Sequence, residues 1–365
     1  MRLKIVANKK NIWVVAAGTG GHIFPGLRVA EFMEKSASDL EFCFFGSRQR
    51  LESEIIPKHG RRIKFLSASP WKGKGLIARI NALIDLTFGF FQVLAFSFRE
   101  TPTALISVGG YVSLPVAFAV FVRGKKIFLI EPNIRAGVSN RLVSKMARLA
   151  FSTPGSDAAK VFKCPVKEFG NPVRSGFQVC EVRDQVKKII VLGGSQGARA
   201  ICESMIRAAA KLNFEKKGIE VLLQTGAANL EFSMALKKEL SLKETFVVKA
   251  FVDQVDAELL SSDLVVARAG AMTLAELAIS ALPTIFIPFP FAADDHQRVN
   301  AKLLEDAGAA KCVDEREGEF QKNLENELSR LIDNVELRRS RASRMKEWGR
   351  PAATEAISAA ILEAL

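Results

Sequence analysis

Cysteine is sparse in this chain of 365 residues. The five cysteines are odd in number, scattered along the sequence and never closely spaced. Neither a disulfide framework nor a zinc site has such spacing. We expect reduced thiols in the cores of a cytosolic protein, at positions Cys43, Cys164, Cys180, Cys202 and Cys312.

Two nucleotide-binding motifs are absent. No GxxxxGK[ST] segment occurs, so ATP hydrolysis has no support. The glycine turn at residues 18–21 is followed by His22 and Ile23, without the third glycine of a dinucleotide fingerprint, and the turn at residues 193–197 departs from it too. One such turn can be a plain strand-to-helix connection. Two, each opening one half of the chain and each carrying polar residues, favour ligand binding.

A long uninterrupted apolar run is also missing. Residues 76–98 approach the length of a membrane span, but Arg79 and Asp85 interrupt them. Each charge would cost about 2.5–3.5 kcal/mol in hydrocarbon. We expect a peripheral helix, either buried in its domain or with part of its apolar face in a bilayer interface. The amino terminus shows no signal peptide, because a short strand-like run at residues 12–17 enters the glycine turn.

The net charge of +13 is unevenly distributed. Residues 1–150 contain 23 Lys and Arg against 9 Asp and Glu, whereas residues 151–365 contain 29 against 30. Only the first half is therefore suited to an anionic surface, which could be nucleic acid or a membrane.

The length fits two domains, and 48% hydrophobic content is enough for two cores. Strand-like and helix-like segments alternate in both halves, which predicts α/β domains with parallel sheets. We place an N-terminal Rossmann-like domain at residues 1–168, a C-terminal one at 169–350, and a last helix at 351–365 that packs back on the first domain. The expected strands are residues 12–17, 40–45, 63–66, 104–108, 126–130, 188–192, 220–223, 246–249, 263–267 and 284–287. The expected helices include residues 25–35, 112–122, 137–146, 198–212, 317–331 and 335–348.

Residues 263–301 carry the densest set of motifs. A buried strand leads into the turn Arg268 to Thr273, and Thr273 is expected to open a helix, whose amides would suit an anion. Glu276 follows three residues later. It either forms a capping pair with Thr273 or grips a ribose diol, as acids do in nucleotide folds.

Six motifs occur in order along the chain: AGTGGHIFP at residues 17–25, GGYVS at 109–113, GNPVR at 170–174, GGSQGA at 193–198, RAGA at 268–271, and DDHQ at 294–297 with Asn300-Ala301. Together they resemble the MurG family, the peptidoglycan N-acetylglucosaminyltransferases. The resemblance implies the GT-B architecture, two Rossmann-like domains facing a cleft. It also implies an inverting transfer of GlcNAc from UDP-GlcNAc to the C4 hydroxyl of MurNAc in undecaprenyl-diphosphoryl-MurNAc-pentapeptide (lipid I), giving lipid II.

The resemblance also assigns the donor site. It implies Glu276 on the ribose, the Val252 backbone beside the uracil, and Gln297 on GlcNAc hydroxyls. Arg174 and Ser195 are expected at the diphosphate or sugar. The start of the helix is expected near the diphosphate, with residues Ala271, Met272, Thr273, Leu274 and Ala275. Amides and an arginine can stabilise departing UDP, so no metal or other cofactor is expected.

The acceptor side is implied to contain Thr19, Gly20, Gly21 and Asn133. His22 is the candidate general base, with a structural or phosphate-binding histidine as the alternative. Glu131 is a less favoured base. His59 is expected to be solvated and His296 to help position Gln297. The chain reads Ile130-Glu131-Pro132-Asn133 where the family usually has His-Glu-Gln-Asn, and Ala17 replaces a glycine.

Two other functions stay open at this point. One is another UDP-sugar enzyme of the same architecture, such as a glycolipid glycosyltransferase or a UDP-GlcNAc epimerase. The other is a non-catalytic nucleic-acid-binding module that uses Arg61, Arg62, Lys64, Lys72 and Lys74. For the favoured function we expect a peripheral protein at the cytoplasmic face of the inner membrane, with UDP-GlcNAc, lipid I, the anionic membrane and cell-wall synthesis proteins as partners.

Overall fold

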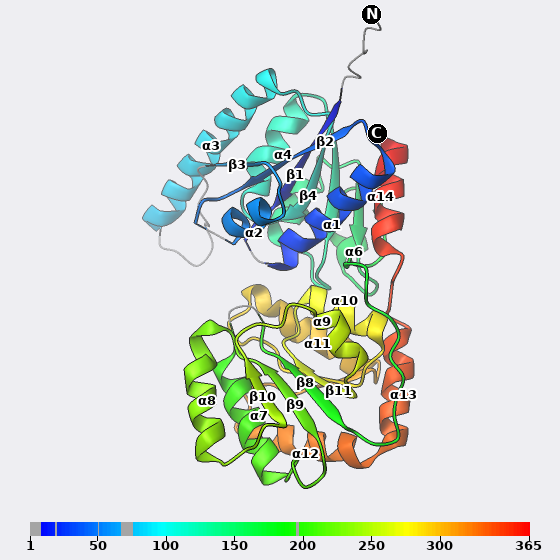
Figure 1. Ribbon diagram of the computed structural model, residues 1–365. Helices are drawn as coiled ribbons and strands as arrows, with labels where there is room; N and C mark the ends of the chain where they lie inside the picture. Colours follow the sequence, from blue (N-terminus) through cyan, green and yellow to red (C-terminus); the bar gives the residue numbers. More distant parts are fainter. Residues whose placement is uncertain (1–8, 19, 50, 67–75, 195–196) are drawn as a thin grey trace, which may run out of the picture. The chain divides into compact units, whose positions relative to one another are not determined.

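The chain forms two α/β units (Figure 1). The structure is a computed structural model that describes residues 9–18, 20–49, 51–66, 76–194 and 197–365. Unit 1 comprises residues 1–173 and 352–365, and unit 2 comprises residues 174–351. Each unit has one parallel sheet with helices on both faces, so the expected pair of Rossmann-like domains is confirmed.

The sheet of unit 1 has the strand order β3-β2-β1-β4-β5-β6-β7, and every pairing is parallel. The order reverses between β1 and β4, which is where doubly wound sheets bind ligands. The strands are β1 (Lys10–Ala16), β2 (Leu40–Gly46), β3 (Ile63–Phe65), β4 (Ala104–Gly109), β5 (Lys126–Glu131), β6 (Leu149–Ser152) and β7 (Val166–Lys167).

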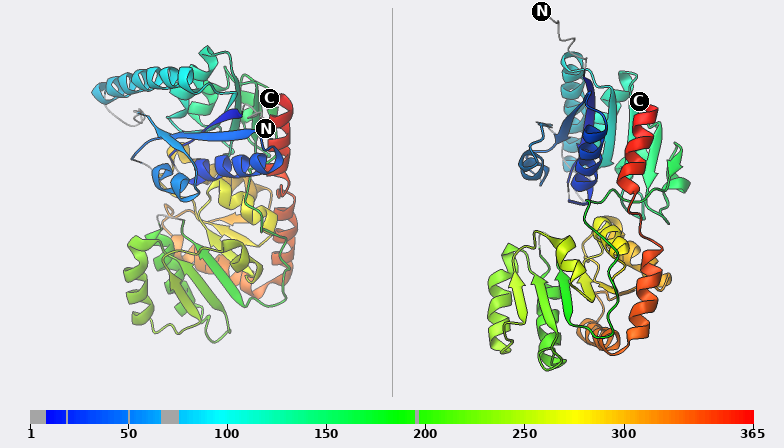
Figure 2. Two further views of the ribbon diagram at one scale, coloured as in Figure 1. Left: turned by 45° about the horizontal axis from the view of Figure 1, so that its top comes forward. Right: turned by 45° about the vertical axis from the view of Figure 1, so that its right-hand side comes forward.

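Side chains that alternate along β1 fill two separate cores in unit 1. Ile12 and Val14 pack with α1 and the C-terminal helix α14, while Trp13 and Val15 pack with α3, α4 and α5 on the other face. Figure 2 shows α14 alongside α1. The helices are α1 (Gly20–Ser36), α2 (Glu52–Lys58), α3 (Leu76–Arg99), α4 (Ser113–Val122), α5 (Val138–Val143), α6 (Ala158–Val161) and α14 (Ala353–Ala364).

Unit 2 repeats this plan with the strand order β10-β9-β8-β11-β12-β13. Its strands are β8 (Lys188–Leu192), β9 (Glu220–Gln224), β10 (Phe246–Lys249), β11 (Leu264–Ala267), β12 (Thr284–Phe286) and β13 (Ala310–Cys312). Its helices are α7 (Arg199–Lys211), α8 (Leu230–Glu239), α9 (Val255–Leu260), α10 (Ala271–Ser280), α11 (His296–Asp306), α12 (Phe320–Asp333) and α13 (Val335–Lys346).

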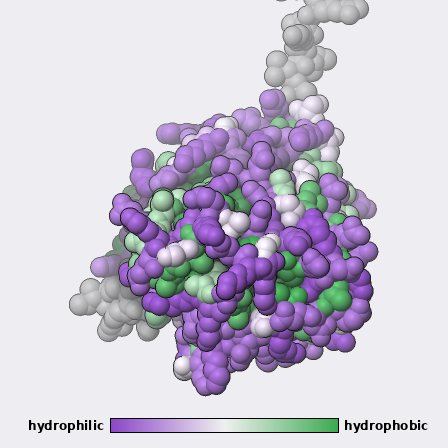
Figure 3. All heavy atoms as spheres, turned by 60° about the horizontal axis from the view of Figure 1, so that its bottom comes forward, coloured by the Kyte–Doolittle hydropathy of each residue, from purple (hydrophilic) through white to green (hydrophobic). Residues whose placement is uncertain are grey.

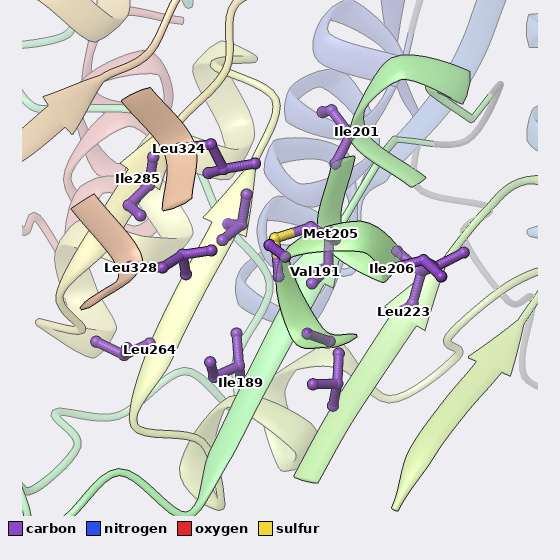
Figure 4. Close-up of a cluster of buried hydrophobic side chains, with 14 of the residues drawn as sticks. Ile189, Val191, Ile201, Met205, Ile206, Leu223, Leu264, Ile285, Leu324 and Leu328 are labelled. Carbon is purple, nitrogen blue, oxygen red and sulfur yellow. The ribbon is translucent and has the colours of Figure 1, made fainter. Parts of the chain in front are cut away.

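One core of unit 2 lies between its sheet and helices α7 and α12. Figure 4 shows Ile189 and Val191 of β8 pointing toward Met205 of α7 and Leu328 of α12. The intervening Ile190 and Leu192 point to the opposite core, which α10 and α11 cover. A strand with both faces buried explains why residues 188–192 are an almost continuous apolar run.

Two helices begin earlier than the sequence predicts. Helix α1 begins at Gly20 and contains Pro25, so Gly20, Gly21 and His22 form its first turn. Helix α10 begins at Ala271 after Gly270. Thr273 is therefore inside the first turn and is not the N-cap residue, so the capping alternative for Thr273 and Glu276 lacks its N-cap. Proline and threonine are common near helix starts, but here the preceding glycines already adopt the backbone geometry of the turn.

Helix α3 exposes a row of large apolar side chains, so the expectation of a simply buried helix is wrong. Those on α3 are Leu83, Ile84, Phe88, Phe91 and Phe98, and α4 adds Phe118, Phe121 and Val122. We call these eight residues the α3–α4 patch. By contrast, hydrophilic residues cover most of the face shown in Figure 3. Among the residues that the structure describes, no helix has the length and apolar character needed to cross a bilayer.

The cysteines have the environment expected of core thiols. Cys43, Cys180 and Cys202 are buried, the other two are half-buried, and all five are free thiols. Burial raises the pKa of each thiol, to about 11 for Cys180 and about 12 for Cys312. These groups stay protonated near neutral pH and are poor nucleophiles.

Candidate functional site

The described residues of the predicted acceptor side follow two strands of unit 1: Gly20, Gly21 and His22 come after β1, and Asn133 comes after β5. The turn after β1 is held by Glu52, which is fully buried. One carboxylate oxygen of Glu52 accepts from the Gly18 amide at 3.0 Å and the other from the Ser47 amide at 3.0 Å. Glu52 thus ties the loops after β1 and β2 together. Thr19, the next predicted site residue, lies outside the described residues.

His22 lies in the first turn of α1, close to Gly109 and Gly110 at the end of β4. A Cβ added at Gly109 would lie 3.3 Å from Cδ2 of His22, and one added at Gly110 only 2.5 Å from the carbonyl oxygen of Ala17. Both glycines have positive φ angles, of 118° and 88°. Only glycine fits this approach without strain, which explains the GGY motif: it lets the end of β4 contact the turn after β1.

Asn133 is held in place by Glu131, the last residue of β5. The backbone and side-chain nitrogens of Asn133 both donate to Oε1 of Glu131, at 3.0 and 3.3 Å. The other carboxylate oxygen accepts from the Gly137 amide at 2.8 Å and from Nδ2 of Asn140 at 3.0 Å. Burial raises the pKa of the Glu131 carboxyl although four N–H groups donate to it. Its contacts are those of a positioning residue.

The loop after β5 is fixed from a second side by the Gly-Asn-Pro-Val-Arg motif. Nδ2 of the buried Asn171 donates to the carbonyl of Pro132 at 2.8 Å. Asn133 is therefore held directly by Glu131 and indirectly through the preceding residue, Pro132. The replacement of two polar family residues by Ile130 and Pro132 leaves this anchoring intact, because Ile130 points into the core and only the carbonyl of Pro132 is used.

In unit 2, the turn between β11 and α10 is built on Arg268. Its guanidinium donates to the carbonyls of Ile287 and Pro288, at 3.1 and 2.8 Å, and pairs with Glu315 at 2.9 Å. Nδ2 of Asn300 donates to the carbonyl of Ala269 at 3.1 Å. Two residues of the family motifs thus fix the turn that precedes α10.

The predicted phosphate segment forms the first turns of α10. Ala271 is its first residue, while the side chain of Leu274 is buried in the core and can offer a ligand only its backbone. Met272, Thr273, Ala275 and Glu276 are half-buried. The first amides of a helix lack intrahelical acceptors and favour anions, so α10 presents a carboxylate about one turn beyond an anion-binding end.

Val252 and the glycine turn after β8 are connected by Gln224, the last residue of β9. Oε1 of Gln224 accepts from the Val252 amide at 3.2 Å, and Nε2 donates to the Gly194 carbonyl at 3.3 Å. The amide of Val252 therefore already has an acceptor within the protein. Ser195 lies outside the described residues.

Arg174 and Gln297 both contact their own unit. Arg174 pairs with Asp256 at 3.4 Å and its guanidinium lies 5.2 Å from the ring centroid of Phe177. Oε1 of Gln297 accepts from the Phe289 amide at 3.0 Å. Gln297 thereby fixes the loop that follows β12, where Asp294 and Asp295 adopt φ angles of 56°.

Sequence reasoning missed Glu52, Asn140 and Gln224, three buried polar residues that hold the turns in place. Each of the three has a feature in the sequence that points to a structural role. Gln224 ends an apolar strand, Glu52 opens the helix after β2, and Asn140 interrupts an otherwise apolar helix face. Polar groups at such positions must find partners on folding.

The chain matches two domains of one enzyme family. The glycosyltransferase family 28 N-terminal domain matches residues 12–152, and the glycosyltransferase family 28 C-terminal domain matches residues 188–357. A protein of Mannheimia succiniciproducens named UDP-N-acetylglucosamine--N-acetylmuramyl-(pentapeptide) pyrophosphoryl-undecaprenol N-acetylglucosamine transferase is 33% identical, over 98% of this chain and 99% of that protein.

Solved structures share the fold of this chain. The crystal structure of Acinetobacter baumannii MurG has a TM-score of 0.79 and 26% identity, covering 97% of this chain and 99% of that chain. A UDP-N-acetylglucosamine 2-epimerase has a TM-score of 0.64 and 12% identity, covering 98% and 96%. At that identity the second likeness shows the fold alone.

Proposed function

The chain belongs to the MurG family of N-acetylglucosamine transferases, and from this premise we propose that it transfers GlcNAc from UDP-GlcNAc to lipid I, forming lipid II for peptidoglycan. The observation that carries this proposal is the 33% identity to a named family enzyme over nearly the whole of both chains. Both family 28 domains are represented, so the donor and acceptor halves of the enzyme are both included.

We place the donor on unit 2. The amides at the start of α10 and the Arg174 guanidinium are suited to the diphosphate, and the Glu276 carboxylate to the ribose. The Val252 carbonyl is suited to the uracil, because Gln224 already occupies the Val252 amide. As the bond from C1 of GlcNAc to UDP breaks, the developing charge is stabilised by groups that are already oriented.

We place the acceptor on unit 1. His22 takes the proton from the C4 hydroxyl of MurNAc while that oxygen attacks C1 of GlcNAc and UDP leaves with the bonding electrons. The position of His22 supports this role, since its ring lies close to Gly109 at the carboxyl end of β4. Asn133, held by Glu131, is the second acceptor-side group.

The α3–α4 patch supports peripheral attachment to a membrane. Phe88, Phe91 and Leu83 are 57%, 59% and 66% exposed, which is unusual for large apolar side chains in such density. The patch lies in the basic half of the chain, and Arg123 stacks on Phe98 at 4.4 Å. Apolar side chains edged by cations suit the surface of an anionic bilayer.

The nucleic-acid hypothesis loses two of its five cations to ion pairs within the protein. Arg61 pairs with Glu34, and Arg62 pairs with Glu100 and Glu41. Lys64 lies over the Phe96 ring at 4.7 Å, while Lys72 and Lys74 lie outside the described residues. Two of the five proposed phosphate contacts are therefore already neutralised within the protein.

The test is product analysis with a lipid I analogue and labelled UDP-GlcNAc. The proposal predicts a labelled disaccharide lipid that forms only when both substrates are present. Free ManNAc without a disaccharide would identify an epimerase instead, and labelled glycolipid from diacylglycerol would identify a different lipid glycosyltransferase.

A further inference from the structure

Helices α3 and α4 enclose a groove that the proposed reaction has not used. The groove has a volume of about 470 Å³, within the range of roughly 300–1,000 Å³ that is typical of small-ligand sites. It lies wholly within unit 1. Its lining residues are Leu86, Thr87, Phe90, Phe91, Leu114, Pro115, Phe118 and Met146.

The lining is suited to pure hydrocarbon. Seven of the eight side chains are apolar, and the hydroxyl of Thr87 donates to the Leu83 carbonyl of its own helix at 2.9 Å. A peptide or nucleotide would leave its polar groups without partners here, at a large cost in affinity. A ligand that contains only carbon and hydrogen incurs no such cost.

One end of the groove adjoins the proposed acceptor site. Leu114 and Pro115 lie in the first turn of α4, four and five residues after Gly110, and the Gly109-Gly110 pair closely approaches His22 and Ala17. Phe118 is about 6 Å further along the helix axis, at 1.5 Å per residue, and is 48% exposed. The groove therefore leads from the turns that we assign to the acceptor outward to the α3–α4 patch.

The surroundings carry positive charge. Met146, which lines the groove, is preceded by the exposed Lys145 and followed closely by the exposed Arg148. An apolar groove beside cations complements a molecule that joins a hydrocarbon chain to an anionic head. A diphosphate lipid has this chemistry.

We infer that the α3–α4 groove binds the first isoprene units of the acceptor's polyprenyl chain, beside its diphosphate, so that the lipid is held by the protein and not only by the bilayer. This inference rests on the proposed function. The polyprenyl chain then contributes to recognition of the acceptor, and Thr87 lies at the rim of the groove that binds it.

The experiment compares two soluble acceptor analogues with the same head, one with a long isoprenoid chain and one with a single isoprene unit, in the absence of vesicles. Each buried methylene group strengthens binding about fourfold. We therefore expect KM for the long-chain acceptor to be lower by about tenfold or more, with the same kcat.

The decisive variant is Thr87→Trp, which fills the groove from an exposed position. We expect its KM values for the two acceptors to become equal, while kcat and KM for UDP-GlcNAc stay unchanged. Thr87→Val, which keeps the volume, is the matched control and retains the preference for the long chain. Phe121→Ser lies in the patch but outside the groove, and it also retains that preference.

If Thr87→Trp still has a lower KM for the long-chain acceptor than for the single-isoprene acceptor, the inference is overturned, even if that variant binds vesicles less well. Loss of the preference in Phe121→Ser would also overturn it, because general adsorption would then explain the effect. Turnover of the single-isoprene acceptor tests the proposed function separately: if neither acceptor gives a disaccharide, the function itself fails.

Discussion

Single residues set the geometry of both proposed half-sites through buried hydrogen bonds. Glu52 and Gln224 each bridge two loops through the two polar atoms of the side chain, and Glu131 ties the loop after β5 to α5. A bridging side chain that loses one partner leaves a buried polar group unsatisfied, at a cost of about 1–3 kcal/mol. These residues therefore stabilise the loops. The loops in turn keep the residues that we assign to the substrates in fixed positions.

His22→Ala is predicted to lower kcat by about 10²- to 10⁴-fold, the usual contribution of a general base. Affinity for UDP should change little, because we place the nucleotide on unit 2. Steady-state UDP release and calorimetry of the same variant measure the two quantities. An unchanged kcat would leave His22 with a structural role.

Glu276→Ala is predicted to weaken UDP-GlcNAc binding by about 10- to 100-fold, since a hydrogen bond to a charged group contributes about 1.5–3 kcal/mol. Glu276→Gln keeps the shape without the charge and should lose less. Isothermal calorimetry measures both. Full donor affinity in the alanine variant would show that the ribose assignment is wrong.

At the scale of elements, the strands and glycine turns could be predicted, because apolar runs end at glycines in both halves. Strands β8 and β10 have the predicted bounds. The first residues of α1 and α10 could not be predicted. Proline and threonine are common at helix starts, so Pro25 and Thr273 gave the stronger local signal. Strands β6, β7 and β13, of two to four residues each, were missed.

The site could be predicted only where a motif marks it. Asn133 and Val252 lie in segments that the sequence singled out, but Asn171 and Gln224, which help to hold these segments, come from elsewhere in the fold. Asn171 reaches Pro132 across 39 positions, and Gln224 reaches Val252 across 28. Contacts at such separations depend on sheet topology, which local patterns do not encode.

Helices α3 and α4 lead to a prediction about membrane binding. Phe88→Ser should weaken binding to anionic vesicles by about tenfold or more, because burying a phenylalanine side chain contributes about 1.5–3 kcal/mol. Phe251→Ser in unit 2 is the matched control, since both rings are 57% exposed. Vesicle sedimentation compares the two. Equal losses would mean that the α3–α4 patch is not the contact surface.

At the scale of the whole molecule, the chain passes from unit 1 to unit 2 and returns. Helix α14 follows all of unit 2 but completes a core of unit 1, where Ile357 and Ile361 are fully buried against α1. The stability of unit 1 therefore depends on the last residues of the sequence as well as the first.

Ile361→Ala should lower the free energy of unfolding of unit 1 by about 2–5 kcal/mol, the usual cost of this truncation in a core. The transition of unit 2 should stay in place. Glu363→Ala, at an exposed position of the same helix, is the control. Differential scanning calorimetry reports both transitions. A shift of the unit 2 transition alone would contradict this division of the chain.

The central claim is that the enzyme moves GlcNAc from UDP to lipid I with inversion at the anomeric carbon. Proton NMR of a reaction with UDP-GlcNAc and a soluble lipid I analogue tests it most directly. We expect one β-linked disaccharide for each UDP released. An α-linked product, or ManNAc in place of the disaccharide, would contradict it.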